Sequence, residues 1–461
     1  MSTFDGIIQE FPYIQIDYFR KSPDRPPPLA CFLSHVHSDH LQGLESFRAP
    51  FIYCSAATRE LLLHIEKYPH RMNFSKGILE SRRLHYKHLS KLLRPIPLDT
   101  PTEIELTPRL SIRVTLLNAN HCTGAVMFLI EGNGKAILYT GDIRGAYLLE
   151  KFSQLVVSFS LTKKQLSLDM LYLDNTFARP SYVRHTFPSK AEGLAELLQK
   201  VALYPKDTIF YFRAWTFGYE EVWVALSAVL NSKIHLDRYQ IGLYRSLVSC
   251  SRVDANEASA LCGYELGNRF VSGCLSEDEQ SRIHSCEPGV TCSAISSSKL
   301  VYIIPIVHRA KDGSKVPELG IGGGGGDLYQ IHELEIPDES TLEQLDKLCL
   351  EQIHDSQVLS QTRKTLVEAF RSKSKTLSLD NYRAKNVQNI SLESLIHILS
   401  RGHSKENLGL DAMQRLSATN DKQGHTLPNT IHFPYSRHSS YLELLDMGVS
   451  MQQLFGHLCS G

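Results

Sequence analysis

The strongest chemical signal in the sequence is the segment HVHSDH at 35–40. Three histidines and one aspartate supply the nitrogen and oxygen ligands that a divalent metal ion takes in proteins. The segment directly follows an apolar stretch, LACFLS at 29–34, which predicts a buried strand. In an extended chain His35 and His37 point to the same side, whereas the last two residues of the motif can turn toward a second ion. One motif could therefore supply ligands to two metals.

Three further candidate ligands follow predicted strands. His121 comes after SIRVTLL, Asp142 after AILYT and Asp174 after MLYL. Taken singly, each is the kind of residue that also serves in turns and caps. Strands that end at one rim deliver their following residues to the same place, so together with the 35–40 motif these residues predict a metal site.

The elements that must position these residues change in type along the chain. Up to about residue 175 the sequence reads as strands broken by turns, with a hairpin around the Gly-Asn-Gly of 132–134. Helical spacing in 190–203 and 219–230 flanks a short strand at 208–212, which is an α/β alternation. The stretch 309–427 contains a glycine run and many Ser and Lys residues, and we expect it to be poorly ordered.

Composition limits the class of protein. The 461 residues are 42% hydrophobic and 21% charged, with 49 basic and 49 acidic side chains, which indicates a folded chain of two or three domains and not a disordered or fibrous one. No apolar run approaches the roughly 20 residues of a membrane span, so we expect no membrane insertion. The N-terminus has no secretory pattern, and in a reducing compartment the ten cysteines would be thiols or metal ligands.

Charge is segregated locally even though it cancels overall. Between Lys67 and Arg94 eight basic residues face a single Glu, and between His332 and Asp355 eight acidic residues face a single Lys. The basic stretch, and within it Arg82, Arg83 and Lys87, could follow a phosphate backbone. The alternative is that both stretches are ordinary solvated surfaces.

The order of these motifs resembles a known family. HVHSDH, then NHCTG and TGD, resembles the metallo-β-lactamase fold, and TGDIR, LDNTF, RIHSC and PYSRHSSYLEL resemble the β-CASP nucleases, most closely the Artemis and DNA cross-link repair branch. The implied fold is α/β, a metallo-β-lactamase αββα sandwich with an inserted β-CASP α/β domain. The implied domains are 1–177 for the first part of the sandwich, 178–300 for the β-CASP domain, and 301–461 for the return to the sandwich around the 309–427 insertion.

The same resemblance implies roles for the site residues. One metal would be held by His35, His37 and His121, and the other by Asp39, His40 and His438, with Asp142 bridging them. Asp17 and Asp174 would support the ligands from behind. The implied catalytic residues are Asp39, His40, Asp142, Asp174 and His438.

A second, structural zinc site is implied by the resemblance to Artemis. Its ligands would be His235, His284, Cys286 and Cys292, and His284 would then be structural, not catalytic. Ordinary buried thiols and a hydrogen-bonded histidine are the alternative. The imidazole-rich catalytic set favours zinc, one ion or two, while its carboxylates also admit Mn²⁺ or Mg²⁺ at the second position.

The resemblance leads us to expect a nuclear DNA repair nuclease. It would trim 5′ ends and cut hairpins or overhangs of DNA, in cross-link repair or alongside end-joining proteins. A terminal phosphate could dock where predicted helices begin, at Thr216 and Gly218 or at Ser439 and Ser440, although helix caps explain these residues equally well. An RNA-processing nuclease and a non-catalytic binding relative are the alternative functions.

Overall fold

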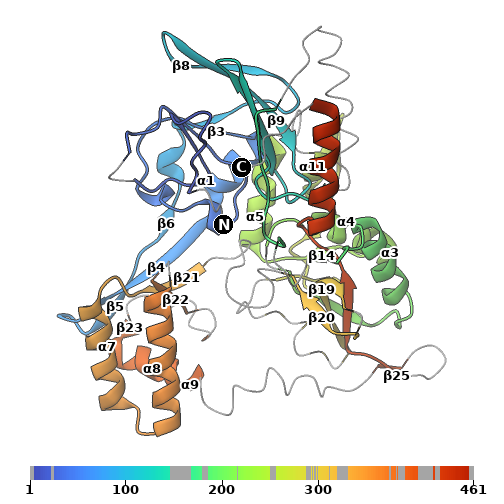
Figure 1. Cartoon of the computed structure of the whole chain (residues 1–461). Coiled ribbons are helices and arrows are strands. Elements are labelled where there is room, and N and C mark those ends of the chain that lie inside the picture. The colour runs from blue at the N-terminus through green and yellow to red at the C-terminus, as the bar shows by residue number, and fades with distance from the viewer. Residues whose placement is uncertain are drawn as a thin grey trace.

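Two sheets packed face to face form the core of the first lobe, here called the sandwich lobe (Figure 1). The computed structural model describes residues 5–21, 25–145, 168–178, 185–214, 216–249, 256–286, 292, 294, 297, 299–310, 312–318, 331–372, 375–379, 382, 390–402, 419–420 and 426–455. The first sheet is parallel, in the order β1 (Ile14–Ile16), β2 (Ala30–Phe32), β3 (Ile52–Cys54), β7 (Leu93–Pro95). The second runs β12 (Met170–Tyr172), β11 (Lys135–Tyr139), β10 (Val126–Gly132), β9 (Leu110–Asn118), β8 (Thr102–Thr107).

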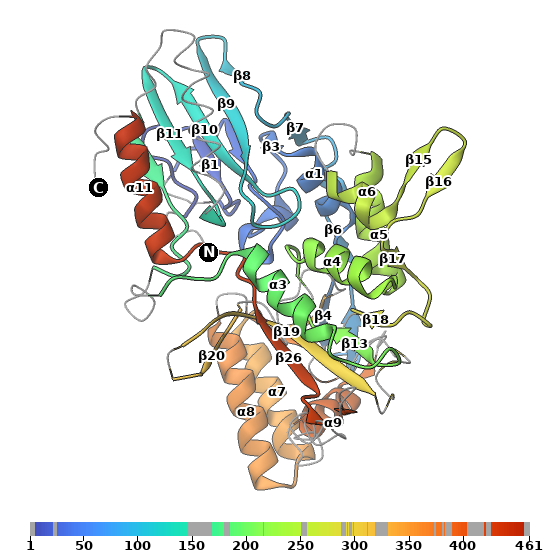
Figure 2. The same cartoon turned by 90° about the vertical axis from the view of Figure 1, so that its right-hand side faces the viewer.

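A helix covers each outer face of this sandwich. α1 (Ala56–His64) packs on the first sheet through Leu61 and Leu62, and its N-terminus is capped by the hydroxyl of Ser55. α11 (Tyr441–Phe455) packs on the second sheet through Leu444 and Met447. Figure 2 shows α11 lying along the sheet of β9, β10 and β11, and in Figure 1 it lies beside β9. The four layers confirm the predicted αββα order.

The predicted hairpin in the second sheet is confirmed. Gly132 pairs with Lys135, and the two residues between them, Asn133 and Gly134, have φ of 51° and 77°. Two successive positive φ values are what a tight two-residue hairpin needs. The hairpin fixes the register of β10 on β11 and so the place where β11 ends, just before Asp142.

The second lobe is built on a mainly parallel sheet. Its order is β17 (Leu275–Ser276), β14 (Ile234–His235), β18 (Ile283–His284), β13 (Ile209–Phe212), β19 (Leu300–Arg309), β20 (Lys315–Pro317), with β26 (Thr430–Pro434) also paired to β19. Its helices are α3 (Lys190–Val201), α4 (Glu220–Leu230), α5 (Arg238–Ser246) and α6 (Asn256–Cys262), followed by the hairpin of β15 (Tyr264–Leu266) and β16 (Arg269–Val271). In Figure 2, α3 and α4 cover one face of this sheet.

The predicted return to the sandwich at residue 301 is wrong. β19 pairs with β13 and β26 pairs with β19, so both strands extend the sheet of the second lobe. Apolar residues of β19 and β26, such as Ile303 and Phe433, are buried in the same core as Trp223 of α4. In the described residues after 300, no strand joins either sheet of the sandwich, and α11 packs on the second of these sheets.

The expected disorder of 309–427 is also wrong for the part that the structure describes. This part forms β21 (Ile331–Glu335), α7 (Glu339–Gln352), α8 (Ser356–Arg371), β22 (Thr376–Ser378), β23 (Ile390–Ser391), α9 (Leu392–Gly402), β24 (Thr419–Asn420) and β25 (Thr426–Leu427). The carboxylates of Asp338 and Asp355 cap α7 and α8. Polar helices of this kind become stable because one face of each packs on a core.

That core is shared with an earlier part of the chain. β21, β22 and β23 join a sheet with β4 (Glu66–Asn73), β5 (Ile78–Ser81) and β6 (Leu84–His85). We call this third body, made of 66–85 and 331–402, the insert unit; in Figure 1 it lies below the sandwich lobe. Within the described ranges, no helix has the length and apolar character needed to cross a bilayer.

Candidate metal centre

The 35–40 segment leaves β2 as extended chain and then turns in a short 3₁₀ helix, η1 (Ser38–His40). Asp17, which follows β1, accepts hydrogen bonds from the backbone N–H and the hydroxyl of Ser34 at 2.7 and 2.6 Å. The same carboxylate lies 3.0 Å from Nδ1 of His40. Because β1 and β2 are parallel neighbours, Asp17 lies next to the start of the motif. It contacts Ser34 and His40 on the side that faces the protein interior.

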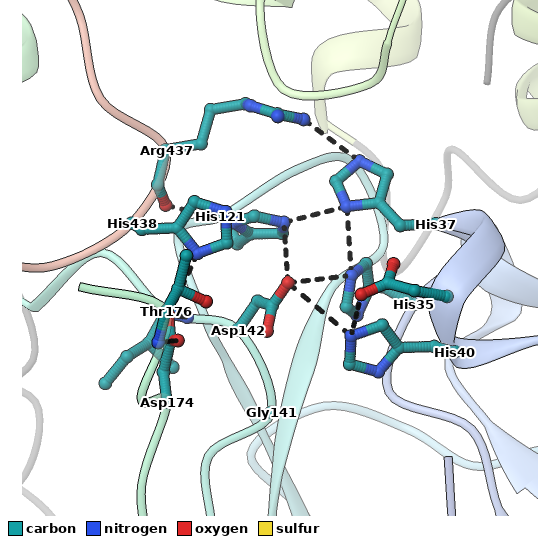
Figure 3. A network of polar contacts seen from close by, with 12 residues as sticks. His35, His37, His40, His121, Gly141, Asp142, Asp174, Thr176, Arg437 and His438 are labelled. Atoms are coloured by element: carbon teal, nitrogen blue, oxygen red, sulfur yellow. Dashed lines mark hydrogen bonds and ion pairs between the residues drawn. The ribbon is translucent and has the colours of Figure 1, made fainter. Parts of the chain in front are cut away.

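Three histidine nitrogens converge beside the carboxylate of Asp142 (Figure 3). Nδ1 of His37 lies 3.0 Å from Nε2 of His35 and 2.9 Å from Nε2 of His121. Oδ2 of Asp142 lies 3.6 Å from each of those two Nε2 atoms. Ligand atoms of a tetrahedral zinc ion are about 3.3 Å apart, since each lies about 2.0–2.1 Å from the metal. The arrangement therefore fits a single metal ion.

The surroundings of these three histidines favour the neutral form that binds a metal. Burial lowers the pKa of His35, His37 and His121, and neighbouring cationic groups lower it further. Nδ1 of His121 lies 3.0 Å from the carbonyl oxygen of Arg437, which can only accept a hydrogen bond. That bond places the proton on Nδ1 and leaves the Nε2 lone pair directed at the other ligand atoms.

Further candidate ligands, His40 and His438, lie on opposite sides of the Asp142 carboxylate (Figure 3). Nε2 of His40 is 3.5 Å from the Asp142 carboxylate and 3.7 Å from Oδ2 of Asp39. Asp142 also forms a potential metal-binding group with Asp174 and His438. Nδ1 of His438 lies 3.0 Å from Oδ2 of Asp174, whose carboxylate also accepts the backbone N–H groups of Ile143 and Thr176. Asp142 therefore belongs to two groups of potential ligands, whereas no such group among the described residues unites Asp39 and His40 with His438.

The carboxylates around His40 and His438 favour positive charge. Burial lowers the pKa of His40, but Asp39, Asp142 and Asp17 outweigh it and raise the pKa well above the ordinary value. The pKa of His438 is raised in the same way, by Asp174 and Asp142 against burial. The carboxylates thus favour the protonated form of both rings, and a bound cation would take the place of these protons.

The elements explain why these side chains meet. β11 and β12 are parallel neighbours, so the residues that follow them, Asp142 and Asp174, emerge at the same edge of the sheet. Arg144, buried at 2% exposure, ties this edge to the second lobe. Its guanidinium donates to the carbonyl oxygens of His438 at 3.2 Å and Pro188 at 2.7 Å and pairs with Glu443 of α11.

The structure places the predicted phosphate-docking residues close to the metal ligands but gives them internal partners. The carboxylate of Glu220 accepts the backbone N–H of Gly218 at 3.0 and 3.1 Å, where an anion at the start of α4 would bind. Ser439 is buried and bonds to Gly145 and Ile143, and Ser440 exchanges capping bonds with Glu443. These contacts are those of helix caps and loop anchors. Thr216 lies 3.4 Å from Nε2 of His37.

A separate cluster unites the four residues predicted to hold a structural zinc ion. His235 and His284 end the paired strands β14 and β18, and with Cys286 and Cys292 they form a buried group of potential ligands. Sγ of Cys292 lies 3.3 Å from Nδ1 of His284. A hydrogen bond from Cys286, with further bonds to both histidines, lowers the pKa of the Cys292 thiol against the effect of burial. His284 lies in this cluster and not in the groups around Asp142.

The predicted basic residues lie away from both clusters, at the sheet of the insert unit. Arg82 and Arg83 follow β5, Lys87 begins the short helix η3 (Lys87–Leu89), and all three are exposed. Arg83 is paired with Glu66 of β4.

Sequence reasoning missed three buried charged residues at the centre: Arg144, Glu318 and Arg437. Arg144 lies two positions after the predicted ligand Asp142, and Arg437 lies one position before the predicted ligand His438. This closeness to a motif was the only sign in the sequence that the two arginines belong to the site. Nothing in the local sequence marks Glu318, because its partner Arg437 lies more than a hundred positions away.

Comparison with known proteins agrees with this geometry. Residues 12–210 match the family described as Beta-lactamase superfamily domain. The chain is thus similar to this domain over 199 of its 461 residues. It is 33% identical over 259 residues to Protein artemis of Rattus norvegicus, covering 52% of this chain and 33% of the relative. It is 33% identical over 214 residues to DNA cross-link repair 1A protein of Homo sapiens, covering 45% and 17%. It is 36% identical over 178 residues to 5′ exonuclease Apollo of Mus musculus, covering 39% and 28%.

The chain therefore spans a third or less of the length of these relatives. It is a homologue of the Artemis and DNA cross-link repair proteins, as the motif order predicted, and its domain type implies the use of a divalent metal.

Proposed function

We propose that this protein is a metal-dependent DNA nuclease that hydrolyses phosphodiester bonds, as a 5′ exonuclease and at hairpins or overhangs. The observation that carries the proposal is that Asp142 belongs to two groups of potential metal ligands, one with His35, His37 and His121 and one with Asp174 and His438. The relative named 5′ exonuclease Apollo and the relatives of the Artemis and cross-link repair type support DNA as the substrate.

The ligand sets suggest how two ions would be held. His35, His37 and His121 would hold one with Asp142, and Asp39, His40 and His438 would hold the other with the same aspartate. Zinc suits the three-imidazole group, and the group richer in carboxylates also accepts Mn²⁺ or Mg²⁺. Two neighbouring ions of this kind supply a water of lowered pKa and positive charge for the oxygens of a phosphodiester.

The protein's own residues have distinct tasks in this proposal. The carbonyl of Arg437 keeps the His121 proton on Nδ1, and the Asp17 carboxylate, 3.0 Å from Nδ1 of His40, favours a proton on that atom, so that both Nε2 atoms remain available. Asp174 does the same for His438, where Nδ1 is the bonded atom. Burial of the histidines excludes bulk water from the ligand atoms, which strengthens their electrostatic interactions with a charged phosphate.

The cellular role is part of the same proposal. A nuclease of this kind would act in the nucleus, in cross-link repair or in end joining with its partner proteins. The second lobe, which we propose to be the β-CASP domain, would hold the DNA against the sandwich lobe.

The proposal is tested by cleavage of a 5′-phosphorylated, 3′-labelled single-stranded DNA with the wild type, Asp142→Asn and Asp207→Asn. Asp207 is an exposed aspartate paired with Lys299 in the second lobe and is a matched control. We expect Asp142→Asn to lower cleavage by at least about 100-fold, because changes merely behind metal ligands already cost 10- to 100-fold. Asp207→Asn should cleave like the wild type. Cleavage of a matched RNA alone would contradict the DNA assignment.

We further propose that His235, His284, Cys286 and Cys292 hold a structural zinc ion. Purified Cys286→Ser should contain one zinc fewer per chain and unfold at a lower temperature than the wild type. Cys262→Ser, a thiol of the same lobe outside the cluster, should keep the wild-type zinc content. Equal zinc in all three proteins would contradict the proposal.

A further inference from the structure

Arg437 connects the second lobe to two of the metal-binding histidines. It follows β26 and is only 3% exposed. Its Nη1 donates to the hydroxyl of Thr216 at 3.0 Å and to the carbonyl of Phe217 at 2.9 Å, both in the segment after β13. The same nitrogen lies 3.2 Å from Nε2 of His37, which is itself 3.3 Å from the Phe217 carbonyl (Figure 3). The guanidinium thus fastens this segment of the second lobe against a histidine of the sandwich lobe.

The main chain of Arg437 acts on the second histidine. Its carbonyl oxygen accepts a hydrogen bond from Nδ1 of His121 at 3.0 Å. This bond fixes both the tautomer and the orientation of the His121 ring. The opposing loop leaves no spare room, because a Cβ atom on Gly218 would lie 2.7 Å from Cδ of Arg437 and 2.6 Å from the carbonyl oxygen of His121. Gly218 also has a φ of 111°, which favours glycine. The sequence therefore permits a close approach at this point.

Glu318 supplies the charge that a buried guanidinium needs. It follows β20, is 3% exposed, and has a carboxylate oxygen 3.6 Å from Nε of Arg437. Within the described part of the chain, neither of its carboxylate oxygens accepts a hydrogen bond. A buried carboxylate with no hydrogen bond is costly unless a nearby opposite charge offsets it. The contact with Arg437 provides this charge.

We propose that Arg437 is a positioning residue that holds His37 and His121 in their ligand geometry and docks the second lobe on them, with Glu318 as its counter-charge. The inference rests on the proposed metal-dependent nuclease. It assigns to Arg437 no contact with the substrate. Thr216 and Gly218 then serve this docking contact instead of a phosphate.

The test compares Arg437→Met, Glu318→Met and the double variant with the wild type in the full chain. Three quantities are measured: the affinity for Co²⁺ from its absorption spectrum, the free energy of unfolding in urea, and kcat and KM on the labelled DNA. Replacing both members of a buried pair by apolar residues of similar size often restores stability, whereas removing one does not. Arg238→Met, at an arginine with an 89% exposed side chain, is the control.

We expect Arg437→Met to bind Co²⁺ about 10- to 100-fold more weakly, as found for residues that orient metal ligands. The double variant should regain stability but not metal affinity, and its loss of activity should lie in kcat and not in KM. Arg437→Lys, which keeps the charge and a donor, should recover part of the affinity. Wild-type Co²⁺ affinity in Arg437→Met, or affinity that returns together with stability in the double variant, would overturn the inference. A wild type that binds Co²⁺ but cleaves no DNA would count against the proposed function alone.

Discussion

Histidines in this protein carry or lose protons according to which charges surround them. At His40 and His438 several carboxylates outweigh burial and raise the pKa. At His35 and His37 burial dominates and lowers the pKa. The same residue type is therefore favoured as a neutral ring at His35 and His37 and as a charged ring at His40 and His438. Spacing in the sequence gives the residue types but not this difference, which depends on neighbours from other strands.

His432 allows such an electrostatic effect to be measured away from the metal ligands. Burial lowers its pKa to about 4, and Lys315, Arg309 and Lys200 add to the effect. Above pH 6.5, its ordinary pKa, neither the folded nor the unfolded chain binds this proton. As the pH falls from 6.5 toward 4, the unfolded chain takes up the proton first, so the free energy of unfolding decreases.

We predict that His432→Gln loses less stability than the wild type over this pH window. Glutamine can still accept the hydrogen bond that Lys315 donates to Nδ1 of His432 at 3.2 Å. The backbone carbonyl of residue 432, which accepts hydrogen bonds from Lys200 and Arg309, is unchanged by the substitution. The measurement is urea unfolding of both proteins at several pH values between 4 and 7.5. Parallel stability curves for the two proteins would show that His432 does not contribute.

At the scale of elements, the hydrophobic patterns of the sequence predicted individual strands and helices correctly. The apolar stretches at 111–117, 208–212 and 299–307 are the strands β9, β13 and β19, and the helical spacing at 190–203 is α3. The candidate ligands that follow strands also meet as predicted, because parallel neighbours end at one edge.

The insert unit could not be predicted in this way. β21 pairs with β4 in the register Ile331 to Lys67, so its partner strand lies far back in the sequence. α7 and α8 are rich in charged and polar residues, a composition that also suits a disordered segment. The apolar faces of these helices are buried in a core that also contains Leu79 of β5, and the sequence does not indicate this distant partner.

This shared core leads to a prediction for Leu79→Ala. Leu79 is fully buried, and truncation of a buried leucine costs about 2–5 kcal/mol. We expect the loss to fall on the insert unit, so that amide hydrogens of α7, α8 and α9 exchange faster while those of β9 and β10 do not. Leu350→Ala, at a leucine of α7 that is 51% exposed, should leave exchange unchanged. If protection of α7 to α9 survives Leu79→Ala, these helices do not depend on β5.

In the whole molecule, the insert unit joins a segment that precedes the second lobe, 66–85, to one that lies between its strands β20 and β26, 331–402. Its sheet combines β4, β5 and β6 with β21, β22 and β23, and Arg71 of β4 pairs with Glu335 of β21. The basic and acidic stretches of the sequence thus lie side by side in one sheet. Part of the positive charge predicted to follow a phosphate backbone is already balanced inside the protein.

This balance separates the basic residues into those that remain available to DNA and those that do not. Arg83 is engaged with Glu66, whereas Arg82 is exposed and forms no ion pair with any residue in the described ranges. A phosphate contact releases condensed counterions, so losing one lowers the slope of log K against log salt by about 0.9 for duplex DNA and 0.7 for single strands. Arg82→Glu should therefore weaken binding and flatten the salt dependence more than Arg83→Glu.

Arg109→Glu, at an exposed arginine between β8 and β9, is the matched control. Binding to a fluorescent DNA is measured at several salt concentrations with the wild type and all three variants. A slope that changes equally in the three variants would reflect net charge alone, and an unchanged slope in Arg82→Glu would remove the insert unit from the DNA path.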